Sequence, residues 1–329
     1  MLHTTRQSSR RCDDERRRDA QVPRPRHDHR PPRREPPHRG HPSDSRGAPP
    51  AAPREWAVLG DSYTAGFFAG DQIEPRDGCL RTSGSYPVVA HAAARPDLEL
   101  VNVSCVGAET KHVWESQVPP AGTDPVAPQL EALSDRTEVV TIGLSGNSLG
   151  FGTILGTCLA VGGIGSERPG TPCTTFYKAD VESGRLGTTL ETKLADVLSE
   201  YGDMLEAVRA AAPNATIVTV GYPQLAPTDP QQCTWNEPTQ FSRVARADLP
   251  FFRLAEERLN LGIGAQSVAH GAVFVDPTDA SAGHDVCSDP DTRWIEGMQG
   301  ADGTDTLVHP NTRGHAGMAA LVASAVGVG

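Results

Sequence analysis

The sequence predicts an α/β fold in which helices cover both faces of a parallel β-sheet. Short strand-like runs alternate with helical patterns along the chain, which is typical of parallel sheets. These runs are apolar throughout instead of alternating apolar with polar residues, as expected for strands buried on both faces. Five runs have this character: residues 56–59, 98–103, 138–142, 215–220 and 272–275.

Helical spacing of apolar residues separates and follows these runs. We expect helices over residues 86–94, 126–133, 194–212, 251–269 and 312–326. Stretches rich in glycine and proline interrupt the alternation and are predicted to be long loops. These stretches cover residues 150–173, 222–248 and 276–308.

The composition divides the chain near residue 55. Residues 1–54 contain 14 basic and 7 acidic residues and scarcely any large apolar side chain, which predicts a disordered Arg/Pro-rich leader, or a start assigned too far upstream. Residues 55–329 contain 16 basic and 34 acidic residues, a net charge of −18, and form the predicted folded domain. So acidic a domain is a poor candidate for nucleic-acid binding.

Seven cysteines are present, and all but Cys12 lie in the predicted domain. No Cys-x-x-Cys pair occurs, so zinc or thioredoxin-type redox chemistry has little support. An even number in an acidic, lysine-poor domain indicates three disulfides and an oxidising compartment. Six cysteines allow fifteen pairings, and order along the chain favours the local ones, Cys79–Cys105, Cys158–Cys173 and Cys233–Cys287.

The predicted location is therefore extracellular, although residues 1–54 contain no apolar stretch of the ~7–15 residues that a signal peptide needs. A start assigned in the wrong place explains this best; another export route, or reduced cysteines, would explain it too. The sequence contains no run apolar enough to span a bilayer, so no stable membrane insertion is expected.

Residues suited to nucleophilic catalysis follow the predicted strands. Ser62 comes just after the first run, and His309 lies in a loop before the last helix, where it could serve as the base that activates a serine hydroxyl. Gly107 and Asn147 follow the second and third runs. The carboxyl ends of parallel strands meet at one edge of a sheet, so these residues are expected to gather there. The Ser62 N–H, the Gly107 N–H and the Asn147 amide are candidate donors to an oxyanion.

Taken singly, each of these residues has an ordinary structural interpretation, as a helix cap, a turn or a loop residue. Their joint occurrence after successive strands favours a site. In order along the chain, they resemble the four sequence blocks of the SGNH (GDSL) hydrolases, most closely the secreted actinomycete lipase/esterase branch. The matching segments are Gly60-Asp61-Ser62-Tyr63, Gly107, Gly146-Asn147 and His309-Pro310-Asn311.

The resemblance covers residues 55–329 and implies a three-layer α/β/α fold of flavodoxin-like type with a five-stranded parallel sheet. It also implies a monomeric enzyme that hydrolyses carboxylic esters or lipids without a metal or cofactor. Carried over to this sequence, it makes Ser62 the nucleophile and His309 the base. Ser62, Gly107 and Asn147 become the oxyanion hole.

Two positions depart from the family pattern. Ser148 stands where the third block usually has aspartate, but Asn147 is retained. The acid that commonly precedes the histidine by three residues is replaced by Thr306. The resemblance to dyad members of this branch implies that the Thr306 main-chain carbonyl orients His309. The Asp305 carboxylate is the second choice.

Two other interpretations compete with this one. Residues 146–150 satisfy Gly-x-Ser-x-Gly, the nucleophile elbow of α/β-hydrolases, which would make Ser148 the nucleophile. The elbow needs a helix directly after it, and the glycine-rich stretch that follows argues against one. The fold could also serve as a non-catalytic binding module. A metal hydrolase is disfavoured, because no His-Glu-x-x-His motif occurs.

Overall fold

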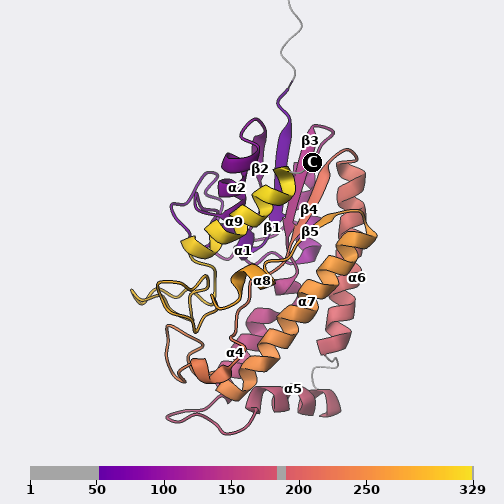
Figure 1. Ribbon diagram of the computed structural model, residues 1–329. Coiled ribbons are helices and arrows are strands. Elements are labelled where there is room, and N and C mark those ends of the chain that lie inside the picture. Colours follow the sequence, from indigo (N-terminus) through magenta and orange to yellow (C-terminus); the bar gives the residue numbers. More distant parts are fainter. Residues whose placement is uncertain (1–51, 184–189, 328–329) are drawn as a thin grey trace, which may run out of the picture. The chain divides into compact units, whose positions relative to one another are not determined.

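The computed structural model describes residues 52–183 and 190–327 (Figure 1). The predicted leader lies outside these residues except for positions 52–54, and Cys12 lies outside them as well. All five expected strands form, and they pair in parallel in the order β2-β1-β3-β4-β5. The strands are β1 (Glu55–Gly60), β2 (Glu99–Asn102), β3 (Thr137–Gly143), β4 (Thr216–Val220) and β5 (Val273–Val275).

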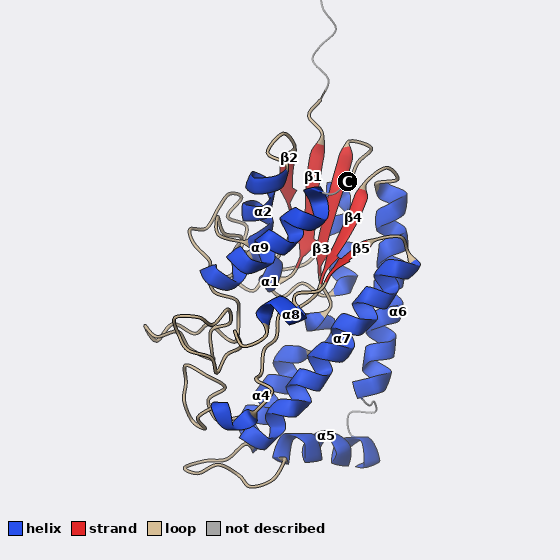
Figure 2. Ribbon diagram, viewed as in Figure 1, coloured by secondary structure: helices blue, strands red, loops and turns tan. Residues whose placement is uncertain are grey.

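Helices cover both faces of this sheet, giving the three-layer α/β/α architecture and the flavodoxin-like strand order (Figure 2). The side chains of successive β1 residues point to opposite faces of the sheet. Trp56 and Val58 pack in one core and Ala57 and Leu59 in the other, and all four are fully buried. Helices α2 (Tyr86–Ala94) and α9 (Thr312–Gly327) cover the first core, and α6 (Leu190–Ala211) and α7 (Leu249–Ala269) cover the second.

The sequence missed two helices that lie beyond the carboxyl edge of the sheet, α4 (Phe151–Val161) and α5 (Pro172–Ser183). Helix α4 contains two glycines, which lower its intrinsic helix propensity. It is stabilised by burial of Ile154 and Leu155 and by its disulfide-bonded Cys158, so tertiary packing outweighs propensity.

The helix expected over residues 126–133 is only a short 3₁₀ turn, because Pro125 and Pro128 interrupt the segment. Within the described residues, no helix is both long and apolar enough to cross a membrane. The remaining elements are short: α1 (Ser62–Ala65), α3 (Gly146–Leu149), α8 (Thr278–Ser281) and the 3₁₀ turns η1 (Thr110–Val113), η2 (Gln129–Ala132), η3 (Pro230–Gln232) and η4 (Arg246–Asp248).

Three disulfides fasten the segments outside the sheet, and they join the pairs that order along the chain favours. Cys79–Cys105 fixes the segment that leaves β2. Cys158–Cys173 ties α4 to α5, and Cys233–Cys287 joins the segments that follow β4 and α8. The parts of the chain that carry least regular structure are therefore closed covalently into loops, which stabilises the fold mainly by restricting the unfolded chain.

The ends of β1 and β3 have glycines because helix α1 crosses directly over them. A Cβ atom on Gly60 would lie 2.3 Å from the Thr64 side chain, and one on Gly143 would lie 2.3 Å from Thr64 Oγ1. Thr64 Oγ1 instead donates to the Gly143 carbonyl at 3.1 Å. The close approach holds α1, and with it Ser62, against both strands.

Candidate active site

Ser62 is the first residue of α1, immediately after β1. Asp61 caps the helix, its side chain accepting a hydrogen bond of 2.9 Å from the Tyr63 N–H. Ser62 is 7% exposed, so its hydroxyl is almost enclosed by protein. The turn from strand to helix thus delivers a serine hydroxyl to the carboxyl edge of the sheet.

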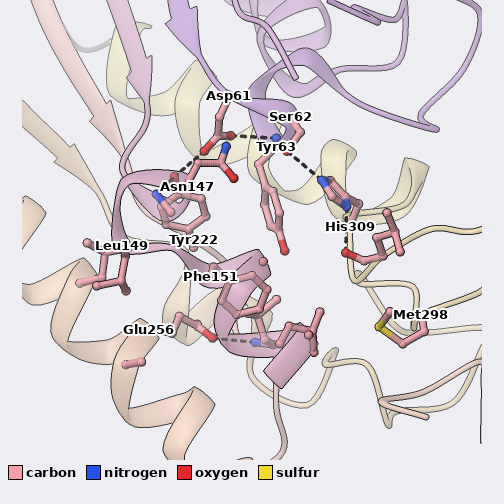
Figure 3. A pocket seen from close by; sticks show the side chains of 18 of the residues that line it. Asp61, Ser62, Tyr63, Asn147, Leu149, Phe151, Tyr222, Glu256, Met298 and His309 are labelled. Carbon is pink, nitrogen blue, oxygen red and sulfur yellow. Dashed lines mark hydrogen bonds between the residues drawn. The ribbon is translucent and has the colours of Figure 1, made fainter. Parts of the chain in front are cut away.

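His309 is the residue that meets this hydroxyl, although 247 positions separate the two in the sequence. The His309 Nε2 atom lies 2.8 Å from Ser62 Oγ (Figure 3). The other ring nitrogen, Nδ1, lies 3.0 Å from the main-chain carbonyls of both Thr306 and Leu307. Carbonyls only accept, so Nδ1 carries the proton and Nε2 is free to accept the Ser62 O–H.

A tight turn before the histidine brings these carbonyls to the ring. Leu307 and Val308 have φ angles of 50° and 56°, in the left-handed region that few non-glycine residues adopt. The Tyr63 hydroxyl donates to the Val308 carbonyl at 2.5 Å and anchors the turn to α1. Thr306 was the expected carbonyl; Leu307 adds one that the sequence did not reveal.

The Asp305 carboxylate does not reach the imidazole. It accepts a hydrogen bond of 3.0 Å from Gln299 Nε2, and the two residues also form an isolated antiparallel bridge. This pairing directs the Asp305 side chain away from His309. The second choice for the orienting group is therefore not supported by the geometry.

Burial lowers the pKa of His309 to about 4, and its hydrogen bonds to the Thr306 and Leu307 carbonyls oppose this shift. A histidine with a lowered pKa is neutral at neutral pH, as a general base must be. The environment therefore favours an unprotonated Nε2, which faces the Ser62 hydroxyl.

The three candidate oxyanion donors differ in how they are held. Asn147 lies in α3, directly after β3, and its Nδ2 donates to the Ala108 carbonyl at 2.9 Å, leaving a second N–H. Gly107 has a φ of 77°, which favours glycine. Within the described residues, neither the Ser62 nor the Gly107 N–H donates to another protein group. Figure 3 shows Asn147 beside Asp61, near Ser62.

Ser148, the nucleophile of the competing interpretation, makes no hydrogen bond to a histidine among the residues that the structure describes. Its Oγ accepts from the Thr110 N–H at 2.8 Å and lies 3.0 Å from Thr110 Oγ1. A helix, α4, does follow this segment, contrary to expectation. The elbow interpretation nevertheless lacks a base, because the imidazole of His309 faces Ser62.

The sequence did not identify Tyr222, which lies two residues after β4 and links the loops carrying Ser62 and Asn147. The Tyr222 hydroxyl donates to Asp61 Oδ2 at 2.6 Å and accepts from the Gly146 N–H at 2.8 Å. Asp61 directly precedes Ser62 and Gly146 directly precedes Asn147, so Tyr222 binds the neighbour of each candidate catalytic residue. The sequence held one weak signal for this role, the position of Tyr222 just after a strand. That signal was not enough, because aromatic residues at such positions commonly belong to the core.

Tyr222 is itself held by α7. Asn260 accepts from the Tyr222 N–H at 2.9 Å and donates to the Tyr222 carbonyl at 2.8 Å. Burial raises the pKa of Asp61 to about 6, and the Tyr222 hydrogen bond opposes this shift. At neutral pH the hydroxyl therefore donates to a carboxylate, which makes a strong hydrogen bond.

A cavity of about 380 Å³ opens beside Ser62 and His309. Its walls are mostly apolar and come from α4, α7 and the loops after β3 and β4, as Figure 3 shows for the labelled side chains. Pockets of this size and character bind the apolar part of small ligands. Apolar residues that line it include Leu149, Phe151, Leu155, Leu159, Leu225, Leu259 and Met298.

The fold, with a serine–histidine pair at the carboxyl edge of its sheet and an apolar cavity beside it, is that of a hydrolase of the flavodoxin-like class. Residues 58–316 match the family model of the GDSL-like lipases/acylhydrolases. The chain belongs to this family, and the protein is a carboxylic ester hydrolase.

Relatives from Streptomyces carry the same activity in their names. The chain is 32% identical over 271 residues to Lipase 2 of Streptomyces coelicolor, covering 80% of this chain and 83% of the relative. It is 31% identical over 300 residues to an esterase of Streptomyces scabiei, covering 83% and 86%.

Solved structures agree in fold. The extracellular lipase of Streptomyces rimosus has a TM-score of 0.62 at 23% identity, covering 83% of this chain and 99% of that one. Phospholipase A1 of Streptomyces albidoflavus has a TM-score of 0.62 at 24% identity, covering 83% and 100%. At these identities, the likeness establishes the three-layer fold alone.

The pKa of His309 predicts an activity profile that extends into acid. If activity needs the neutral imidazole, protonation of His309 should lower it as pH drops through the His309 pKa, between about 4 and the ordinary value of 6.5. The pH dependence of kcat/KM for a neutral ester measures this limb. An acid limb at or above pH 6.5 would contradict the described environment.

Replacing Tyr222 with phenylalanine should lower kcat by up to about a hundredfold with little change in KM. The substitution leaves Asp61 Oδ2 and the Gly146 N–H without their shared partner and lets the two loops shift, and small displacements of reacting groups cost rates of this order. Tyr201→Phe is the matched control, because Tyr201 is also buried but does not line the cavity. Equal effects of the two substitutions on kcat would contradict the bridging role.

Proposed function

We propose that the protein is a secreted esterase or lipase in which Ser62 and His309 act as a catalytic dyad. The observation that carries this proposal is the 2.8 Å contact between His309 Nε2 and Ser62 Oγ. Two carbonyls hold the Nδ1 proton, so the ring presents its acceptor nitrogen to the hydroxyl. A serine activated in this way attacks ester carbonyls.

The reaction follows from this geometry. Ser62 Oγ attacks the acyl carbonyl while its proton passes to His309 Nε2, and the imidazolium then gives that proton to the departing alcohol. Water, deprotonated by the same nitrogen, releases the acyl group from Ser62. The Thr306 and Leu307 carbonyls stabilise the imidazolium in place of a carboxylate.

The oxyanion of the tetrahedral intermediate is assigned to three donors, the N–H groups of Ser62 and Gly107 and the free N–H of the Asn147 side chain. The first two, the N–H groups of Ser62 and Gly107, make no hydrogen bond to another described residue. The third is fixed by the Ala108 carbonyl. Donors held before the reaction need no reorganisation as charge develops, which makes this stabilisation large.

The apolar cavity is assigned to the acyl chain. Helix α4 lines one side of it with Gly152 and Gly156, one helical turn apart, and a Cβ atom at either position would meet nothing within 4 Å. These glycines keep the side of the cavity open. The proposed substrates are therefore esters with an acyl chain longer than acetate.

An extracellular location is supported by the three disulfides and by the likeness to the extracellular lipase of Streptomyces rimosus. The hydrolase unit is assigned to residues 55–329 and acts as a monomer in this proposal. Residues 1–54 have no part in it.

The nucleophile can be assigned by two alanine substitutions. Ser62→Ala should lower kcat by several orders of magnitude, because it removes the covalent route. Ser148→Ala should keep most of the activity, since within the described residues the Ser148 hydroxyl makes hydrogen bonds to Thr110 and none to a histidine. Hydrolysis of p-nitrophenyl butyrate measures both. The reverse ranking would establish the elbow interpretation, and equal, full activity in both variants would point to a non-catalytic site.

Gly156→Leu should shorten the preferred acyl chain. A leucine there would fill open space along the cavity, so kcat/KM for a decanoyl ester should fall about tenfold or more while that for an acetyl ester changes little. Ala160→Leu is the control, since Ala160 lies on the same helix but does not line the cavity. A parallel loss for both esters would show that the cavity does not hold the acyl chain.

A further inference from the structure

One ionisable side chain lines the apolar cavity away from the serine–histidine pair. Glu256, on α7, is 6% exposed and contributes to the cavity wall. Figure 3 shows it beyond Phe151, on the side of the cavity away from Ser62 and His309. A carboxyl group in such surroundings is costly to bury unless its oxygens are hydrogen-bonded.

Its two oxygens are not equally satisfied. Glu256 Oε2 accepts a hydrogen bond of 2.9 Å from the Leu225 N–H, whereas Oε1 has no hydrogen-bond partner among the described residues. Burial raises the pKa of the Glu256 carboxyl well above its ordinary value. The same burial favours the uncharged acid, which has an O–H to donate as well as an oxygen to accept.

The other polar side chains of the cavity are already occupied. The hydroxyls of Tyr63 and Tyr222 donate to Val308 and Asp61. Both oxygens of Asp61 accept hydrogen bonds. Outside the proposed catalytic groups, Glu256 therefore offers the unused hydrogen-bonding atom of the described cavity wall.

We propose that Glu256 is a substrate-binding residue whose free carboxyl oxygen binds a hydroxyl group carried on the acyl chain, remote from the ester bond. The preferred substrates are then esters of hydroxylated fatty acids. This inference rests on the proposed function, since it takes Ser62 and His309 as the place where the ester bond lies.

The selectivity follows from desolvation. An unsubstituted alkyl chain in the cavity would strip water from Glu256 and offer no hydrogen bond in return. A hydroxyl at the matching carbon restores that hydrogen bond. Sites built to hydrogen-bond a substrate hydroxyl discriminate strongly against analogues that lack it.

Glu256 also has a structural role, which the test must separate from recognition. Together with Asn260 one turn later, it holds the loop after β4, through Leu225 and Tyr222. Loosening this loop would slow all esters alike. Recognition instead changes the ratio of kcat/KM between two esters of equal length, one with a hydroxyl and one without.

The experiment uses the whole chain with p-nitrophenyl decanoate and a set of p-nitrophenyl hydroxydecanoates that differ in hydroxyl position. Wild type should prefer one hydroxy isomer over decanoate by about tenfold or more. Glu256→Met should reduce that ratio to near one. Glu256→Gln should keep it within about threefold, because the amide can accept from Leu225 and donate into the cavity.

Glu257→Met is the control, because Glu257 is the next residue of α7, pairs with Arg253 and does not line the cavity. The ratio of this variant should match that of wild type. A wild-type ratio near one at every hydroxyl position would overturn the proposal without any variant. So would a ratio unchanged by Glu256→Met, or a Gln variant that discriminates no better than the Met variant.

Failure of the proposed function has a different signature. If wild type cleaves decanoate and Ser62→Ala does not, but no hydroxy isomer is preferred, the hydroxyl subsite is refuted and the dyad stands. If Ser62→Ala cleaves decanoate as fast as wild type, the dyad is refuted, and the inference about Glu256 falls with it.

Discussion

The register between β1 and β3 is the constraint on which the candidate site depends. Gly60 pairs with Gly143 at the end of the two strands, and the Asp61 N–H continues the ladder to the Gly143 carbonyl at 3.0 Å. The loops bearing Ser62 and Asn147 therefore leave the sheet side by side. β1 and β3 are also the neighbours at which the strand order of this fold reverses, where a crevice opens between the loops.

The strands could be found from the sequence because each is buried on both faces and is therefore apolar along its whole length. The helices beyond the sheet could not. Helix α4 owes its formation to packing and a disulfide, neither of which appears in local propensity. Helix α4 also lines the cavity, so the sequence nominated the candidate catalytic residues but not the apolar wall that α4 places beside them.

A similar division holds within the site. Ser62, His309 and Asn147 belong to short motifs that follow strands, so order along the chain was enough to nominate them, and the structure brings Ser62 and His309 into contact. Tyr222 and Glu256 belong to no motif. Their importance lies in contacts made across the fold, to Asp61 and to the cavity, which exist only once β4 and α7 are in place.

The turn before His309 has a consequence for how the enzyme can vary. Under the proposed dyad, peptide carbonyls orient the ring, and every amino acid supplies a carbonyl. The side chains at 306 and 307 can therefore drift without removing this group, whereas a carboxylate could be lost by a single substitution. Only an insertion, a deletion or a proline that redirects the backbone would remove it. In this proposal, the orientation of His309 depends on the path of the backbone before it and not on which side chains occupy positions 306 and 307.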